Sequence, residues 1–227
     1  MIDSGYIERN YNALLAEIKA AAGGRKIDLV AVTKSGSDEE LLALAALGVT
    51  DIGENRPQEL KRRGELLAAA GFSPRLHQIG SLQKGNVKYI IDGVAMIHSV
   101  DSLALAEKIS RLATERGRVV PVLVEINSAR EEQKGGIMPE DAEDFTASLK
   151  GLPGISPVGI MTMGPRVGDG EDLRPYFRET HELFDRLCAL GRFDGEPILS
   201  MGMSASFRVA IEEGATLVRV GTRLFEK

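Results

Sequence analysis

Apolar residues along the chain alternate between two spacings, one typical of helices and one typical of buried strands. Within residues 4–22 the apolar positions from Ile7 to Ile18 recur every three or four residues, as in an amphipathic helix. Residues 27–33 (IDLVAVT) are β-branched and almost continuously apolar, which is typical of a strand buried on both faces of a parallel sheet. Helical spacing returns over residues 38–47, so helix and strand segments alternate.

The alternation continues to the end of the chain and yields eight strand candidates. The remaining strands are predicted over residues 50–53, 75–79, 94–99, 119–126, 158–163, 198–201 and 217–220. The helices between them are predicted over residues 57–70, 82–91, 103–116, 139–150, 172–190 and 205–213, with a last short turn after the eighth strand. Residues 164–170 (GPRVGDG) are predicted to form a loop.

Eight strands that alternate with helices in 227 residues predict a single (β/α)₈ TIM-type barrel with an extra N-terminal helix. Parallel strands need crossover connections, and eight right-handed crossovers close the sheet on itself. A doubly wound open sheet is the alternative. However, no G-x-G-x-x-G follows the first strand, and no linker divides the chain. We therefore expect one domain over residues 1–227.

Charge and composition narrow the classes of function. The chain has 28 Lys+Arg against 33 Asp+Glu, a formal charge of −5, so it offers no basic field for nucleic acid or an anionic membrane. It contains no apolar run long enough to span a membrane and no signal-peptide pattern, which predicts a cytoplasmic protein. The three histidines and the single Cys188 show no metal-ligand spacing such as HxH, HExxH or CxxC, so we expect no metal site.

In a barrel of this kind the functional site lies at the carboxyl ends of the strands. The candidate residues at those ends are Lys34, Glu54, Asn55, His77 or Gln78, His98, Asn127, Thr162, Ser200, Ser204, Arg219, Gly221 and Thr222. Lys34 follows an apolar strand, and we expect its amine to be partly desolvated at the mouth of the barrel, where its lone pair is available. Such lysines form Schiff bases. The alternative is a lysine that simply emerges into solvent.

The loops after the last two strands have the pattern of a phosphate-binding cradle. Gly202 lets the backbone turn after the seventh strand, and Ser204 is predicted to be the N-cap of the next helix, so that free amides face the pocket. Gly221 and Thr222 open the last short turn. Barrels commonly bind phosphate in these two loops. The alternative is an ordinary helix cap and an ordinary turn.

Arg219 lies in the middle of the apolar eighth strand and must find an acceptor, because a guanidinium does not lose its proton to ease burial. It either reaches outward to a carboxylate or points inward. An inward Arg219 would meet whatever is joined to Lys34, because strand eight neighbours strand one in a closed barrel. An imine-forming lysine, a phosphate cradle and a cation at ring height together describe a site for pyridoxal 5′-phosphate (PLP).

The chain also resembles a known family from about residue 7 to residue 225. The motifs that carry the resemblance are, in order, LVAVTK, DIGENRPQEL, LHQIGSLQ, HSVDS, VLVEIN, EEQKGG, GIMTMGP, LSMGMSASF and ATLVRVGT. They are similar to those of the pyridoxal phosphate homeostasis proteins, whose barrel is similar to the N-terminal domain of alanine racemase. The resemblance implies a protein that binds PLP, acts in its intracellular homeostasis, and delivers it to apo-enzymes that use it.

The resemblance also implies roles for individual residues. Lys34 would form the Schiff base, and Arg219 would face the pyridine nitrogen. The phosphate would be bound by Ser204, Gly221 and Thr222, and the ring would be lined by Asn55, His77 and Met201. The sequence departs from the family pattern at three places: Arg56 stands where tyrosine is usual, Asn86 where a lysine is more familiar, and the chain stops at Lys227 where a longer tail often follows.

Cofactor binding does not by itself make a catalyst. Racemisation needs two proton-transfer groups on opposite faces of the ring, and Lys34 can serve only one. The tyrosines, which could supply the other, lie in helical or loop patterns: Tyr6, Tyr11, Tyr89 and Tyr176. An arginine at the pyridine nitrogen also makes the ring a weaker electron sink. We therefore expect PLP binding without robust catalysis.

Two enzymatic alternatives remain open. The first is a slow PLP-dependent amino-acid racemase that uses water or His77 as its second base. The second is a class I aldolase-like barrel, in which Lys34 attacks a sugar-phosphate ketone and no cofactor is bound.

Overall fold

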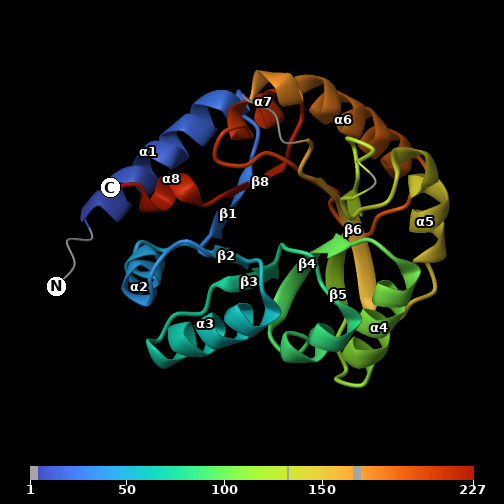
Figure 1. Cartoon of the computed structure of the whole chain (residues 1–227), viewed down its shortest axis with the longest axis horizontal. Helices are drawn as coiled ribbons and strands as arrows, with labels where there is room; N and C mark the ends of the chain where they lie inside the picture. Colours follow the sequence, from blue (N-terminus) through green and yellow to red (C-terminus); the bar gives the residue numbers. More distant parts are fainter. Residues whose placement is uncertain (1–4, 132, 166–169) are drawn as a thin grey trace.

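Eight parallel strands pair in sequence order, and the last strand pairs with the first, so the sheet closes into a barrel (Figure 1). The computed structural model describes residues 5–131, 133–165 and 170–227. Helices cover the outside of the strands. The (β/α)₈ barrel with an additional N-terminal helix that the alternating pattern predicts is therefore confirmed.

The strands are β1 (Asp28–Val32), β2 (Asp51–Glu54), β3 (Arg75–Gln78), β4 (Val94–Val100), β5 (Val120–Ile126), β6 (Ile155–Thr162), β7 (Ile198–Ser200) and β8 (Leu217–Val220). The α-helices are α1 (Gly5–Ala22), α2 (Asp38–Ala46), α3 (Pro57–Ala69), α4 (Leu103–Thr114), α5 (Ala142–Ser148), α6 (Arg174–Ala189), α7 (Phe207–Glu212) and α8 (Thr222–Phe225). Three 3₁₀ helices complete the described elements: η1 (Lys84–Tyr89), η2 (Pro139–Asp141) and η3 (Glu171–Leu173).

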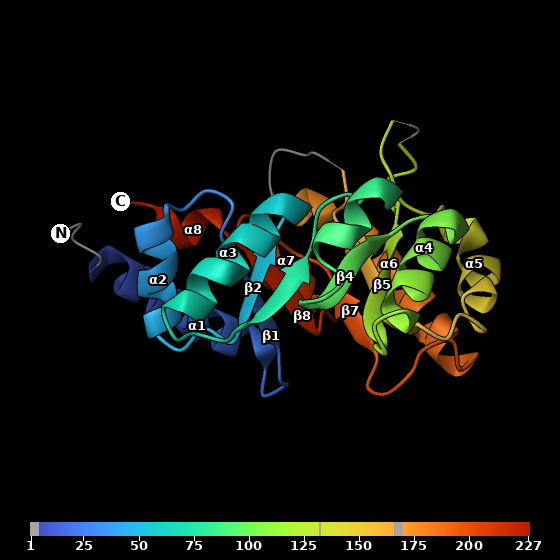
Figure 2. The same cartoon turned by 90° about the horizontal axis from the view of Figure 1, so that it is seen from below.

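The additional helix α1 lies beside the last helix, α8, and beside α2 (Figures 1 and 2). Arg223 of α8 and Arg208 of α7 both donate to the Glu17 carboxylate of α1. Asn10 Nδ2 donates to the carbonyl oxygen of Glu226 at 2.8 Å. The helix therefore fixes the end of the chain that follows β8. Residue 4, where we predicted its start, lies outside the described residues.

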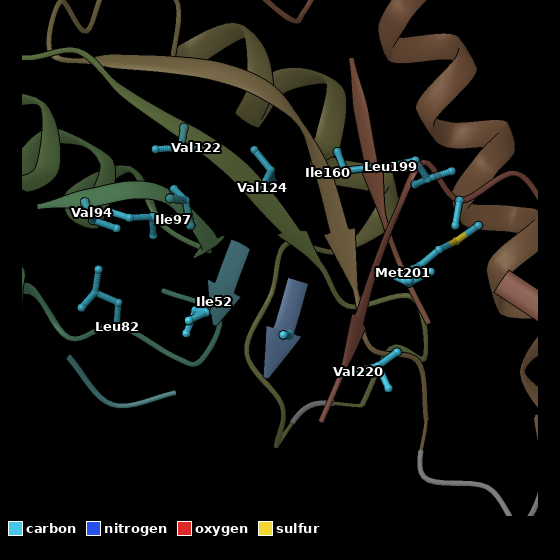
Figure 3. Close-up of a cluster of buried hydrophobic side chains, with 14 of the residues drawn as sticks. Ile52, Leu82, Val94, Ile97, Val122, Val124, Ile160, Leu199, Met201 and Val220 are labelled. Atoms are coloured by element: carbon cyan, nitrogen blue, oxygen red, sulfur yellow. The ribbon is translucent and has the colours of Figure 1, made fainter. Parts of the chain in front are cut away.

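Side chains of the strands alternate between the helices and the lumen of the barrel. Val218 and Val220 belong to the large apolar cluster that contains residues of the surrounding helices, and Figure 3 shows Val220 there beside Leu199 and Met201. Val30 and Val32 belong to a second, smaller cluster together with Leu217. The odd-numbered positions of β8 and the even-numbered positions of β1 therefore face the lumen.

Two predicted elements differ from the structure. The segment predicted as a helix over residues 82–91 is the 3₁₀ helix η1, because it is short and contains Gly85 and Asn86, which are poor α-helix formers. Strand β6 begins at Ile155, three residues earlier than predicted, and includes Pro157. The register between β5 and β6 shifts next to this proline, and a strand tolerates proline at such an irregularity.

Three further helices begin later than predicted. The helix predicted from residue 139 opens with η2 and becomes α-helical at Ala142. The helix predicted from residue 172 opens with η3 and becomes α-helical at Arg174, and the helix predicted from residue 205 begins at Phe207. Residues 166–169 of the predicted loop 164–170 lie outside the described ranges. Among the helices that the structure does describe, none is both long and apolar enough to cross a bilayer.

Candidate functional site

Lys34 lies in the turn that follows β1, at the carboxyl end of the barrel. Its side chain is exposed, so the partial desolvation that we expected is not observed in this structure. Among the described residues, its ammonium group has no ion pair and no hydrogen bond. The amine is therefore accessible to a ligand at the mouth of the barrel.

A buried arginine holds the turn of Lys34 on both sides. Arg63, on the inner face of α3, donates from Nη1 to the carbonyl oxygen of Thr33 and from Nη2 to that of Gly36, the latter at 2.7 Å. Arg63 Nη1 also lies 2.7 Å from Glu54 Oε1. Burial raises the pKa of Glu54, and the hydrogen bonds and charge of its partners Thr33 and Arg63 offset part of that rise. The turn is thus fixed by a buried and compensated ion pair.

Asn55 shares a hollow of about 480 Å³ with Lys34. The other lining residues are Ser35, Glu54, Arg56, Glu59 and Arg63. Gln78 Nε2 donates to the backbone oxygen of Asn55 at 2.9 Å, which fixes this end of β2. The Asn55 side-chain amide has no hydrogen-bond partner among the described residues, so its donor and acceptor are available to a ligand.

The turn of Lys34 is adjacent to the segment after β8. A Cβ added to Gly221 would lie 2.8 Å from the carbonyl oxygen of Val32, and one added to Gly36 would lie 2.6 Å from Cε1 of Phe225 in α8. Only glycine permits these two close approaches. The lysine and the predicted phosphate cradle therefore meet at the same mouth of the barrel.

The cradle itself joins the loops after β7 and β8. The backbone N–H of Gly221 donates to Ser204 Oγ at 3.3 Å. Gly202 has φ +92°, and a Cβ there would lie 2.5 Å from Cβ of Ala210, so the tight turn needs glycine. Thr222 follows as the exposed first residue of α8.

The prediction that Ser204 caps the helix is wrong. Helix α7 begins at Phe207, and its N-cap position is occupied by Ser206, whose hydroxyl makes no capping bond. Ser206 Oγ instead accepts from the N–H of Met203 at 3.2 Å, within a turn that precedes the helix. Because this turn delays the helix, the hydroxyl of Ser204 is left to bridge the two loops.

Arg219 points into the lumen, one of the two orientations that the sequence leaves open. Its Nη1 donates to Ser200 Oγ at 2.6 Å and to the Ser200 carbonyl at 3.0 Å, and its Nη2 donates to the carbonyl of Thr162 at 3.1 Å. These acceptors belong to β7 and to the end of β6. Burial lowers the pKa of Arg219 to about 10, and the charge of Glu125 opposes this shift.

His77 is buried and both its ring nitrogens are already bonded. Nε2 lies 2.7 Å from Asp51 Oδ1, and Nδ1 lies 3.0 Å from Nε2 of His98, whose own Nδ1 lies 3.4 Å from Ser200 Oγ. Burial raises the pKa of Asp51, but the hydrogen bonds from His77 and Arg75 outweigh this effect and bring the pKa to about 2. The arrangement does not favour His77 as a free ring-lining group or a free base.

Met201 is fully buried in the apolar cluster between sheet and helices, where Figure 3 shows it. Its neighbour Ser200 faces the lumen, so the side chain of Met201 points away from it. This position does not favour a contact between the Met201 side chain and a bound ring. The tyrosines also lie away from the strand ends, on α1, η1 and α6.

Sequence reasoning missed three residues that shape the site: Asp51, Arg63 and Glu125. Glu125 places a charge inside the apolar segment VLVEI, the same signal that singled out Arg219, whereas Asp51 begins the short strand β2 and carries no such signal. Arg63 lies at helical spacing between the buried Leu60 and Leu67, which places it on the inner face of α3.

Of these three residues, Glu125 has the fewest hydrogen-bond and ion-pair partners among the described residues. The residue is 7% exposed, and its carboxyl has no hydrogen bond or ion pair among the described residues. Burial and the charge of Asp101 raise its pKa to about 7, which Arg219 opposes. Within the described ranges, no group of three or more His, Cys, Asp or Glu side chains is placed to hold a metal ion.

The chain belongs to the family described as "Alanine racemase, N-terminal domain", whose model matches residues 2–226. Its relatives include the pyridoxal phosphate homeostasis protein of Aquifex aeolicus, which is 40% identical over 212 residues, 91% of this chain and 90% of that protein. The human protein of the same name is 32% identical over 209 residues, 87% of this chain and 75% of that protein. The resemblance inferred from the motifs is therefore confirmed.

Solved structures agree with this assignment. PipY of Synechococcus elongatus, with PLP bound, has a TM-score of 0.85 and 27% identity and covers 97% of this chain and 100% of its own. A crystal structure described as that of an unknown protein from Bifidobacterium adolescentis has a TM-score of 0.89 and 37% identity and covers 99% of this chain and 98% of its own. Alanine racemase of Clostridium difficile, at a TM-score of 0.77, is 20% identical and covers 98% of this chain but only 60% of its own, so it shares the fold alone.

Proposed function

We propose that this protein binds PLP reversibly as a Schiff base on Lys34 and serves PLP homeostasis in the cell, including delivery to apo-enzymes, without robust catalysis. The observation that carries the proposal is the amine of Lys34, which no described residue pairs with, at the same mouth as the loops joined by Ser204 and Gly221. The homeostasis names of the relatives and the PLP bound to PipY support it.

The residues present fit the cofactor. The hydroxyl of Ser204 and the backbone N–H groups of Gly221 and Thr222 would hold the phosphate, and the close packing of Gly221 on Val32 is the kind of approach that a side chain would block. Arg219 would face the pyridine nitrogen from inside the barrel. The side-chain amide of Asn55 would lie beside the ring.

When bound, the cofactor supplies an aldehyde carbon that the amine of Lys34 attacks, and the condensation releases one water. Hydrolysis by one water returns the free aldehyde and the free amine, so loading and release need neither an oxidant nor a reductant. An exposed lysine at an open mouth suits such exchange. The guanidinium of Arg219 would keep the pyridine nitrogen unprotonated, which weakens the ring as an electron sink.

Absorbance spectroscopy tests the Schiff base. The purified protein titrated with PLP should develop the absorbance band of a protonated imine, and Lys34→Ala should abolish it. Lys84→Ala, which removes an exposed lysine from η1, is the matched control and should leave the band unchanged. An unchanged band in Lys34→Ala would refute the assignment.

Deuterium exchange separates the binding protein from the slow racemase. In heavy water with alanine or serine, we expect exchange at the α-carbon to remain far below about 1 per second, the lower end of usual turnover. Exchange at or above that rate would favour the racemase. A sugar phosphate trapped on the protein by borohydride without added PLP would instead favour the aldolase-like alternative.

A further inference from the structure

A continuous line of side-chain hydrogen bonds runs through the lumen from Arg219 toward the opposite end of the barrel. It leads from the Arg219 guanidinium through Ser200, His98 and His77 to Asp51, with donor–acceptor distances of 2.6, 3.4, 3.0 and 2.7 Å. All five residues are at most 4% exposed. They come from five strands, β8, β7, β4, β3 and β2, so only the closed barrel brings them together.

The direction of the bonds follows from the chemistry of the two ends. A guanidinium can only donate, so Ser200 Oγ accepts from Arg219. The carboxylate of Asp51, whose pKa lies at about 2 because hydrogen bonds from His77 and Arg75 outweigh its burial, can only accept. His77 therefore donates from Nε2. Between these ends, His77 Nδ1 and His98 Nε2 lie 3.0 Å apart, and one of these two nitrogens carries the proton of their hydrogen bond.

The Ser200 hydroxyl determines which ring nitrogens of His77 and His98 carry protons. If His77 were doubly protonated, His98 would accept at Nε2 and carry its own proton on Nδ1, facing Ser200. Ser200 Oγ would then receive two donors, and its own proton would have no acceptor among its described contacts in a fully buried position. If both rings are neutral, Ser200 donates to His98 Nδ1, His98 Nε2 donates to His77 Nδ1, and every proton is used.

The burial of His98 supports the neutral arrangement. The ring is completely buried, and its pKa is lowered well below the ordinary value, first by burial and further by the charge of Arg219. The two facing ring nitrogens lie 3.0 Å apart, and the ring planes are inclined at 71° to each other. Two further ionisable groups act on the ends of the line. Arg75 donates to the second oxygen of Asp51 at 2.8 Å, and the charge of Glu125 opposes the lowering of the pKa of Arg219.

We propose that Ser200, His98, His77 and Asp51 form a one-directional hydrogen-bond relay of two neutral, Nε2-protonated imidazoles that positions the Arg219 guanidinium for its ligand. The relay turns the Ser200 proton toward His98, so that a lone pair of Ser200 Oγ faces Arg219 Nη1. The guanidinium is then held by three acceptors and keeps its remaining N–H groups for the pocket. The effect on the cofactor rests on the function proposed above.

The first arm of the test uses the protein without cofactor. Long-range ¹H–¹⁵N NMR spectra should show His77 and His98 as neutral rings with the proton on Nε2 and a bare Nδ1. A proton on Nδ1 of either ring would overturn the proposed direction. Because PLP is absent, this arm is independent of whether the protein binds PLP.

The second arm measures PLP affinity. Ser200→Ala removes the side-chain acceptor, one of the three acceptors of Arg219, and should raise the dissociation constant for PLP about tenfold, the usual cost of one hydrogen bond to a charged group. Ser200→Thr keeps the hydroxyl and should restore binding. Arg75→Gln is the matched control, because Arg75 contacts Asp51 outside the relay, and it should bind like the wild type.

The outcomes separate the two proposals. Wild-type affinity in Ser200→Ala, or equal loss in Ser200→Ala and Ser200→Thr, would overturn the positioning role. Failure of the wild type itself to form the Schiff-base band would overturn the proposed function, while the NMR result would still decide the direction of the relay. If Ser200→Ala does not fold, the NMR spectra of the wild type alone decide.

Discussion

The Arg63 guanidinium and the Glu54 carboxylate form an ion pair of 2.7 Å that is almost completely buried and supports the turn of Lys34. Removal of one partner from a buried pair leaves an uncompensated charge, which typically costs about 3–5 kcal/mol. We therefore expect Arg63→Met to lower the free energy of unfolding by several kcal/mol, measured by urea denaturation.

The neighbouring arginine provides the control for this prediction. Arg62 pairs with Asp38 at 2.7 Å, but both side chains are more than 40% exposed. Arg62→Met should therefore cost less than about 1 kcal/mol. The double variant Arg63→Met with Glu54→Gln should recover part of the loss, because no buried charge is left unpaired. Equal losses of unfolding free energy in Arg62→Met and Arg63→Met would contradict a stabilising role of the buried Arg63–Glu54 pair.

The fold could be predicted from the sequence because a barrel repeats one local rule eight times. Each buried strand, such as residues 27–33, is marked by β-branched residues, and each helix by its spacing. The helix boundaries that were predicted wrongly lie where tertiary packing overrides the local sequence signal. Ser204 has the composition of a helix cap, but a turn through Ser206 delays the helix.

The candidate site could be predicted only in part. The strand ends identify Lys34, Asn55 and Gly221 because a parallel barrel gathers all carboxyl ends at one mouth. Strand ends do not show which way a side chain points there. Ser200 faces the lumen, so Met201 does not, although both follow the same apolar strand. Contacts across the lumen, such as that between His77 and His98, depend on closure of the barrel.

A glycine substitution tests the proposed cradle. Gly221 has a φ of −128°, so Gly221→Ala is not strained by its backbone, but the new Cβ would lie 2.8 Å from the Val32 carbonyl. The loop must shift, and we expect the dissociation constant for PLP, measured by fluorescence titration, to rise about tenfold or more. Gly85→Ala, which faces open space, is the control. Wild-type affinity in Gly221→Ala would speak against a phosphate at this loop.

The buried Glu125 predicts a pH dependence of stability. In the folded protein its pKa is raised to about 7, whereas in the unfolded chain it ionises near 4.5. Between these values the unfolded chain releases a proton that the folded protein keeps. The contribution of Glu125 is therefore fully present below pH 4.5 and is lost as pH rises through 7, by about 3 kcal/mol in all.

Urea unfolding of the protein without cofactor at pH 4.5 and pH 8 checks this sign. Glu125→Gln should gain about 3 kcal/mol relative to the wild type between the two pH values. Glu8→Gln removes the same charge from an exposed position of α1 and should gain nothing comparable. A stability difference between Glu125→Gln and wild type that does not change with pH would contradict the raised pKa.

The proposed function requires one lysine, in the turn after β1, to carry the cofactor. Borohydride reduction of the protein after incubation with PLP, followed by proteolysis and peptide mass spectrometry, tests it most directly. We predict a single pyridoxyl-phosphate adduct on Lys34 at full occupancy. An unmodified Lys34 peptide, or an adduct spread over several exposed lysines with no preference for Lys34, would contradict the account.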